Sequence, residues 1–306
     1  MRAATGGGRV DAFAGFELTD VETPRGVVRA RVGGEGSPLL LLHGFPQTHL
    51  MWHPVAASLA ERFTVIAADL PGYGDSFRPE PAPDHAPHSK RALAQDLVAA
   101  MERLGHERFA VAGHDRGGRV AYRMALDHPQ AVTRLAVLDI VPTGEIWRHA
   151  DATFAVGYWH WAFLSQPAPL PERVIQGEPA AFWIAIERMG IKEGDERYPD
   201  EVVEAYRAQI QDPATVEAMC EDYRAGATID RALDDEDRGA RTIPCPTRAL
   251  WGGAGALPYF YEDPLELWRP LAPEVTGRAV DGASHFLVED APGEVAADLA
   301  GFFGEG

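Results

Sequence analysis

Short apolar runs recur along the chain and predict the strands of a sheet. The runs at residues 38–43 and 63–69 are almost continuously apolar, which is typical of parallel strands that are buried on both faces. Residues 16–32 instead hold two alternating stretches around Thr23-Pro24-Arg25-Gly26, and this pattern predicts a hairpin at a sheet edge. Further strands are predicted at residues 109–112, 134–140, 247–251 and 278–280.

The segments between these runs carry helix and loop signals. In residues 90–104, leucine and methionine recur at helical spacing, with Ser89 as the predicted N-cap and Gly105 as the terminating residue. Residues 77–89 contain four prolines and are expected to form a surface loop with no helix inside it. Other helices are predicted at residues 53–62, from the end of the 113–118 segment through 128, and at 292–303.

The alternation of strands and helices predicts an α/β fold with a mostly parallel, doubly wound sheet. The alternation stops between Pro142 and about Gly226, where the chain is helical and rich in aromatic residues, with a fresh helix start at Asp212-Pro213. We interpret residues 143–226 as a helical cap inserted into a core that residues 1–142 and 227–306 form together.

The charge balance narrows the class of partner. The 306 residues include 28 Lys and Arg against 46 Asp and Glu, a formal net charge of −18. Nucleic acids and anionic membranes are disfavoured as partners, because both bind clustered positive charge. A small anionic substrate would have to be held by local arginines.

Other sequence features point to the cytoplasm. No apolar run reaches the roughly 18 residues that span a bilayer, and the N-terminal residues lack the apolar core of a secretory signal. Cys220 and Cys245 are the only cysteines, too few for a disulfide framework and without metal-site spacing, so we expect two reduced, space-filling thiols. Residues 1–10 are expected to be frayed.

The segment Gly113-His-Asp-Arg-Gly-Gly118 lies between a predicted strand and a predicted helix. Its small-residue spacing resembles the nucleophile elbow of the α/β-hydrolases, in which a tight turn leaves no room for β-carbons. The nucleophile position holds Asp115 rather than serine or cysteine. Taken alone, Asp115 could equally be a helix N-cap.

Three features elsewhere in the chain favour the catalytic interpretation. His43-Gly44-Phe45-Pro46 follows an earlier strand, where the backbone N–H groups of Phe45 and Arg116 would form an oxyanion hole. His285 follows the last strand, where this fold places its catalytic base. Asp139 ends the strand at 134–140 and is the predicted acid that orients His285; Asp263 is a weaker alternative.

An aspartate nucleophile limits the chemistry. Its carboxylate displaces a leaving group from carbon and leaves an alkyl ester on the enzyme, which activated water then cleaves. This sequence of steps suits alkyl halides and epoxides and suits peptides poorly. No Gly-x-Ser-x-Gly motif occurs in the chain, which disfavours a serine hydrolase.

Arg116 and Arg119 lie one helical turn apart beside Asp115, and the cap contains the segment Tyr158-Trp-His-Trp-Ala-Phe-Leu-Ser-Gln-Pro167. With these motifs the chain resembles the fluoroacetate (haloacetate) dehalogenases over nearly its whole length. The resemblance implies an α/β-hydrolase fold with an inserted cap, a small anionic haloacid as substrate, and a homodimer. It further implies that Arg116 and Arg119 bind the substrate carboxylate and that the departing halide is bound by His160, Trp161 and Tyr223.

Two alternatives remain open. An epoxide hydrolase on the same scaffold would use cap tyrosines to protonate the epoxide, with Tyr158, Tyr206 and Tyr223 as candidates, although the residue after the aspartate is usually aromatic in those enzymes. A non-catalytic relative that binds a small ligand is the third hypothesis. We expect no metal and no cofactor, because the histidines lack paired ligand spacing and the Walker pattern of a nucleotide site is absent.

Overall fold

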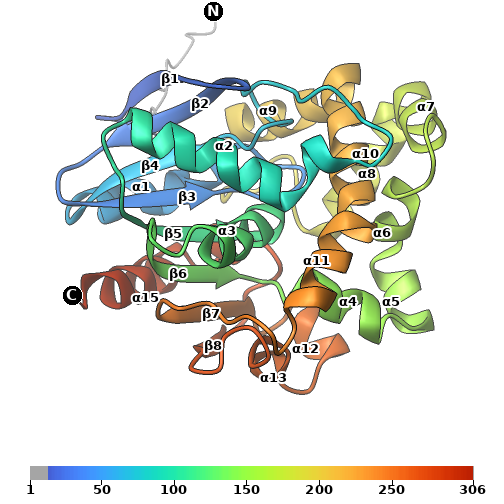
Figure 1. The fold of residues 1–306 in the computed structure, drawn as a ribbon. Coiled ribbons are helices and arrows are strands. Elements are labelled where there is room, and N and C mark those ends of the chain that lie inside the picture. The colour runs from blue at the N-terminus through green and yellow to red at the C-terminus, as the bar shows by residue number, and fades with distance from the viewer. Residues whose placement is uncertain (1–12, 306) are drawn as a thin grey trace, which may run out of the picture.

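One sheet runs through the computed structural model, which describes residues 13–305 (Figure 1). Within these residues eight strands lie in the order β1-β2-β4-β3-β5-β6-β7-β8. Strands β1 and β2 pair antiparallel, as does β2 with β4, and the remaining neighbours are parallel. The bounds are β1 Glu17–Thr23, β2 Gly26–Gly33, β3 Ser37–Leu42, β4 Phe63–Ala68, β5 Phe109–His114, β6 Val132–Leu138, β7 Thr247–Gly252 and β8 Thr276–Val280.

The predicted α/β-hydrolase fold, with its mostly parallel sheet, is confirmed. The edge hairpin forms at the predicted turn, with Thr23 opposite Gly26. The leucine-rich β3 lies between β4 and β5 and buries Leu39, Leu40, Leu41 and Leu42 almost completely, as expected for a central parallel strand. Strand β8 starts two residues before its predicted position, because Thr276 and Gly277 pair with β7 although neither is strongly apolar.

Helices cover both faces of the sheet. Helix α2 (Lys90–Arg103) packs against α3 (Asp115–Asp127) in front of the sheet, and α1 (His53–Ala60) packs against α15 (Pro292–Gly304) behind it (Figure 1). Three short helices near the C-terminal strands are α12 (Leu257–Phe260), α13 (Pro264–Trp268) and α14 (Leu287–Asp290). Two single 3-10 turns, η1 (His49–Trp52) and η2 (Ala86–His88), complete the core.

A helical layer lies between β6 and β7 in the sequence and stands beside the sheet in Figure 1. Its helices are α4 Thr143–His149, α5 Ala152–Gly157, α6 Trp159–Leu164, α7 Leu170–Gly177, α8 Pro179–Met189, α9 Asp200–Gln211, α10 Pro213–Ala227 and α11 Ile229–Asp237. Asp212 caps α10, as its Asp-Pro sequence predicts. Because α11 follows α10 before the chain returns to β7, the cap boundary at residue 226 stays a prediction.

The proline-rich segment 77–89 was expected to hold no helix, and this is wrong at one point. A single 3-10 turn forms at Ala86–His88, closed by the N–H of Ser89 donating to the carbonyl of Ala86 at 3.1 Å. Pro87 is compatible with this turn because a first helical turn needs no N–H from that position. The expectation for residues 1–10 lies outside the described residues.

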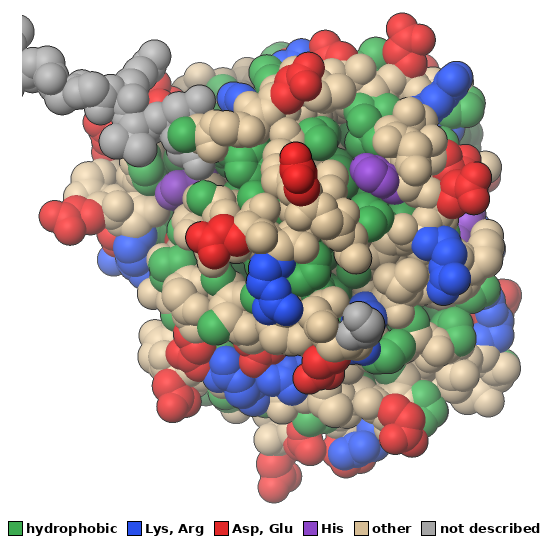
Figure 2. Space-filling view, turned by 90° about the vertical axis from the view of Figure 1, so that its left-hand side faces the viewer, with side chains coloured by type: hydrophobic (Ala, Val, Ile, Leu, Met, Phe, Trp, Pro, Cys, Tyr) green, Lys and Arg blue, Asp and Glu red, His purple; other side chains and the backbone are tan. Residues whose placement is uncertain are grey.

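Charged side chains are mixed on the face shown in Figure 2, where Lys and Arg alternate with Asp and Glu rather than gathering in one basic area. In residues 13–305 no helix combines the length and apolarity that crossing a bilayer requires. Cys220 is buried and Cys245 is half-buried, and both are free thiols.

The N-cap of α2 offers a direct test of the predicted helix start. Ser89 Oγ accepts a hydrogen bond from the N–H of Ala92 at 3.2 Å. Replacing Ser89 with Ala should lower the free energy of unfolding by about 1 kcal/mol, because a helix N–H loses its acceptor, whereas Gly should cost only a few tenths. Urea unfolding followed by circular dichroism measures both values. Equal midpoints for wild type and Ser89→Ala would show that the cap does not stabilise the helix.

Candidate active site

The turn between β5 and α3 places Asp115 at the start of the helix. Asp115 has a φ of +44°, a left-handed conformation that is costly for a residue with a side chain. The glycines of the motif make this turn possible. A Cβ at Gly113 would lie 2.4 Å from the carbonyl oxygen of Gly117, and a Cβ at Gly117 would lie 2.4 Å from that of His43. The sequence spacing therefore has a steric cause.

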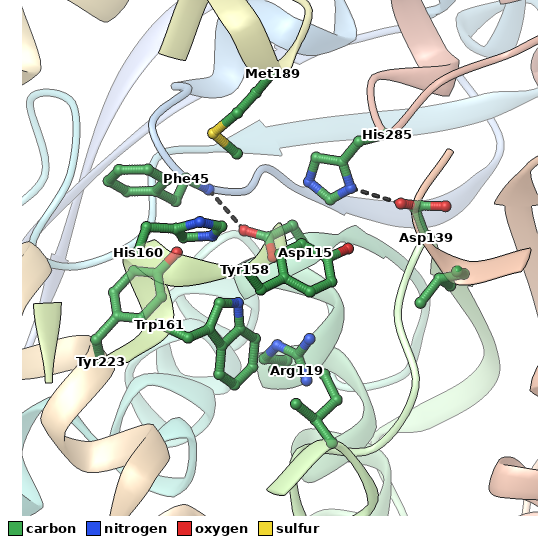
Figure 3. A pocket seen from close by; sticks show the side chains of 12 residues that line it. Phe45, Asp115, Arg119, Asp139, Tyr158, His160, Trp161, Met189, Tyr223 and His285 are labelled. Atoms are coloured by element: carbon green, nitrogen blue, oxygen red, sulfur yellow. Dashed lines mark hydrogen bonds and ion pairs between the residues drawn. The ribbon is translucent and has the colours of Figure 1, made fainter. Parts of the chain in front are cut away.

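The Asp115 carboxylate is buried and remains charged. Burial alone would raise its pKa, but the positive charges of His285, Arg119 and Arg116 outweigh this effect and lower the pKa to about 2. The backbone N–H of Phe45 donates a hydrogen bond to Oδ1 of Asp115 at 2.9 Å (Figure 3). One carboxylate oxygen is thus held by the predicted oxyanion loop, which leaves Oδ2 free to attack.

His285 and Asp139 form the second half of the site. Nδ1 of His285 lies 2.6 Å from Oδ2 of Asp139, and the other oxygen of Asp139 accepts from the N–H of Gly252 at 2.9 Å. Burial disfavours the charged imidazole, but the hydrogen bond and charge of Asp139, with the charge of Asp115, raise the pKa of His285 above its ordinary value. Asp263, the alternative acid, instead caps α13.

A small cavity in front of Asp115 is lined by residues of both the core and the cap (Figure 3). The centre of a water molecule can reach only about 10 Å³ of it, which is room for about one water. Asp115, Asp139, Arg119 and His285 line it from the core. Its apolar wall includes residues that sequence reasoning did not single out, namely Ile146, Met189 and Leu257.

The two arginines of the motif occupy different positions. Arg119 lines the cavity, with Nη1 donating to the carbonyl oxygen of Val141 at 3.0 Å. Arg116 does not line the cavity in this structure; its Nε donates to Oδ2 of Asp222 at 2.6 Å. Its guanidinium carbon lies 4.1 Å from the ring centre of Tyr223, which does line the cavity. The carboxylate-binding role of the pair stays a prediction.

The three residues that the resemblance assigns to the halide converge on the cavity. His160 and Trp161 on α6 and Tyr223 on α10 all line it, and Figure 3 shows their polar atoms on the side facing Asp115. Burial lowers the pKa of His160 to about 3, so its ring is neutral and carries one N–H group. Burial also raises the pKa of Tyr223, so its hydroxyl keeps its proton. The three side chains are therefore hydrogen-bond donors without formal charge.

The three tyrosines predicted as candidate acids of an epoxide hydrolase do not all line the cavity. Tyr158 lines the cavity together with Tyr223. The hydroxyl of Tyr206 instead accepts from Nε2 of Gln47 at 3.5 Å, and Tyr206 is not among the lining residues. The prediction that Tyr206 could act as an acid in this cavity is therefore wrong, because α9 buries its side chain elsewhere in the contact between the cap and the core.

Comparison with known proteins agrees with this architecture. A model of the alpha/beta hydrolase fold matches residues 37–170. A fluoroacetate dehalogenase from Burkholderia sp is 44% identical over 293 residues, which cover 96% of this chain and 95% of that protein. The chain belongs to the fluoroacetate dehalogenase family of α/β-hydrolases.

Other relatives of this dehalogenase family are more varied. A soluble epoxide hydrolase from Corynebacterium sp. (strain C12) is 30% identical over 85% of this chain and 87% of its own length. A crystal structure of a candidate α/β-hydrolase from Nostoc sp PCC 7120 superimposes with a TM-score of 0.91 at 45% identity, covering 96% of this chain and all of that one. These proteins share one fold, but their names refer to different reactions.

Besides the apolar wall, two polar residues beside the cavity were not singled out from the sequence. Nε2 of His114 donates to the backbone oxygen of His285 at 2.8 Å and so fixes the loop that carries the base. Asp222 holds Arg116. His114 directly precedes Asp115, and Asp222 directly precedes Tyr223. The sequence around these two residues does not show which distant residue each of them contacts.

Within residues 13–305 no group of three His, Cys, Asp or Glu side chains is arranged to hold a metal ion.

The raised pKa of His285 predicts an acid limb in the activity profile. A general base must be neutral, so turnover should fall as the pH drops through a value above the ordinary imidazole pKa, while Asp115 stays ionised throughout. Asp139→Asn should lower the maximal rate strongly and move this limb to lower pH, because the charge that raises the pKa is gone. Measuring kcat against pH for both proteins checks this.

Asp263→Asn is the matched control, since asparagine also caps a helix and Asp263 does not contact His285. Its acid limb should coincide with that of the wild type. A shifted limb in Asp263→Asn, with an unshifted one in Asp139→Asn, would reverse the assignment of the acid.

Proposed function

We propose that this protein hydrolyses the carbon–halogen bond of fluoroacetate and similar short 2-haloacids, giving the 2-hydroxy acid and halide. The observation that carries the proposal is an ionised Asp115 beside Arg119 in a small cavity. Among residues 13–305, no carboxylate lies within ion-pair distance of Arg119. A small acid can therefore enter with its charge balanced by Arg119 and its α-carbon facing Asp115.

In the first step, Oδ2 of Asp115 attacks the α-carbon, and the carbon–halogen bond breaks with its electron pair leaving on the halide. This gives an ester between Asp115 and the substrate, with inversion at a chiral α-carbon. The N–H groups of His160 and Trp161 and the hydroxyl of Tyr223 donate hydrogen bonds to the halide as its charge develops. Fluoride is small and leaves poorly, so converging donors matter most for this halogen.

In the second step, His285 removes a proton from water and the resulting hydroxide attacks the Asp115 carbonyl carbon. The negative charge develops on Oδ1, which the N–H of Phe45 already contacts. The N–H of Arg116 is the second proposed oxyanion donor. The tetrahedral intermediate then collapses: the bond from the Asp115 carbonyl carbon to the substrate oxygen breaks, and protonated His285 gives its proton to that oxygen. This releases the hydroxy acid, returns His285 to its neutral form and regenerates the carboxylate with one oxygen from water. The chemistry uses no cofactor. A homodimer and a cytoplasmic location stay predictions.

Fluoride release from fluoroacetate, followed with a fluoride-selective electrode, tests the reaction. The wild type should release fluoride, and Asp115→Asn should not, because the amide is a poor nucleophile. With enzyme in excess in oxygen-18 water, the first product should carry ordinary oxygen and the label should appear in the Asp115 peptide. Label in that first product, with none in the peptide, would rule out the ester. Absence of fluoride together with tight binding of the acid would favour the non-catalytic alternative.

An epoxide hydrolase is the second candidate, because Tyr158 and Tyr223 both line the cavity and the soluble epoxide hydrolase from Corynebacterium is among the relatives. Arg119→Met distinguishes the two activities. For a haloacid, kcat/KM should fall roughly hundredfold or more, since the substrate loses a charged hydrogen-bond partner. For a neutral epoxide it should change little. Steady-state kinetics on fluoroacetate and on a small alkyl epoxide give both numbers, and an equal loss on both substrates would remove the carboxylate-binding role of Arg119.

A further inference from the structure

Arg116 and Arg119 differ in what surrounds their charge. We propose, resting on the function proposed above, that Asp222 is a positioning residue for Arg116: it directs one N–H of Arg116 toward the substrate carboxylate. Arg119 supplies the net positive charge that the acid requires. The two arginines then have different roles: Arg116 donates a hydrogen bond in a fixed direction, and Arg119 supplies the positive charge that balances the substrate carboxylate.

Asp222 holds the guanidinium of Arg116 at two points. Nε donates to Oδ2 of Asp222 at 2.6 Å, and Nη2 donates to the backbone oxygen of the same residue at 2.7 Å. The third nitrogen, Nη1, is buried and has no hydrogen-bond partner among the described residues. An unpaired N–H of a fully buried guanidinium is costly, so a ligand acceptor is the natural partner for it.

The position of Arg116 makes the substrate carboxylate a suitable acceptor. Its guanidinium carbon lies 4.1 Å from the ring centre of Tyr223 and 5.5 Å from that of Trp161. The guanidinium carbon of Arg119 lies 4.7 Å from the same Trp161 ring. Both guanidinium groups thus lie near one indole that lines the cavity, and the proposal places the substrate carboxylate beside this indole.

The surroundings of Arg116 cancel its charge. Oδ1 of Asp222 pairs with Nζ of Lys90, and Lys90 also pairs with Asp230 at 3.3 Å. Arg116, Lys90, Asp222 and Asp230 are each no more than 2% exposed. Two cations and two carboxylates sum to zero in this cluster, so Arg116 offers a fixed donor rather than an excess charge.

Arg119 has no carboxylate within ion-pair distance among the residues that the structure describes, and Asp115 interacts with its charge only from farther away. Its Nη1 donates to the carbonyl oxygen of Val141 and to Oγ1 of Thr143, at 3.0 and 3.2 Å, and both acceptors are neutral. An incoming anion therefore gains its main electrostatic stabilisation from Arg119. Asp222 also joins the cap to the core, because it lies on α10 while Arg116, Lys90 and Tyr73 come from core segments.

The experiment compares Asp222→Asn, Arg116→Met and the double variant on chloroacetate and on chloroacetamide, which has the same leaving group but no charge. Each single variant should lower kcat/KM for chloroacetate roughly ten- to hundredfold, the effect of one hydrogen bond to a charged group, with most of the loss in KM. Chloroacetamide turnover should change little. A purely structural defect would lower both substrates alike and would overturn the proposal.

The double variant completes the cycle. If Asp222 acts through Arg116, then Asp222→Asn should cause no further loss in the Arg116→Met background. Additive losses would overturn the positioning role while leaving the dehalogenase reaction standing. A wild type that releases no chloride from chloroacetate would instead remove the proposed function, and this inference with it.

Asp237→Asn is the matched control for stability. Asp237 is also a buried carboxylate that accepts from a core arginine, Arg123 at 2.6 Å, but it does not line the cavity. This control should lower the melting temperature without changing kcat/KM. If Asp222→Asn does not fold, Asp222→Asn with Lys90→Met removes one charge of each sign and keeps the cluster balanced. It should show the same selective loss on chloroacetate, and an equal loss on both substrates would again count against the positioning role.

Discussion

A carboxylate buried inside a protein stays ionised only if positive charge stands close to it, and this requirement organises the site around Asp115. His285 and Arg119 provide most of that charge, and both are held by groups of the short segment that follows β6, namely Asp139 and Val141. Under the proposed function, the same positive field that keeps Asp115 charged also attracts an anionic substrate. Activation of the nucleophile and binding of the substrate would then be two consequences of one electrostatic arrangement.

Much of the core could be predicted because its signals are local. Continuous apolarity identifies the central strands, and the glycines around Asp115 reflect contacts between residues a few positions apart. Asp139 could be predicted because the carboxyl ends of parallel strands meet at one edge, which brings residues after β5, β6 and β8 together. The residues predicted to bind the halide, His160, Trp161 and Tyr223, were assigned by resemblance, and the structure places them in the wall of the cavity.

The rest depended on packing between distant segments. The sequence places Arg116 and Arg119 one turn apart, but which carboxylate neutralises Arg116 depends on how α10 of the cap meets α3. Tyr206 resembles the other cap tyrosines in sequence, and only its contact with Gln47 shows that it is directed elsewhere. The start of β8 was missed because its pairing with β7, rather than its own apolarity, makes those residues extended.

The position of Asp139 directly after β6 has a consequence for the segment after β7. The carboxylate of Asp139 accepts from the N–H of Gly252 and contacts His285, so in the proposed mechanism residues 253–263 supply no reacting group. Yet Leu257 in this segment forms part of the cavity wall. A substitution at Leu257 therefore changes the shape of the pocket while Asp115, Asp139 and His285 stay in place. Under the proposed function, this is a natural position at which evolution, or a protein engineer, can alter the range of acids accepted.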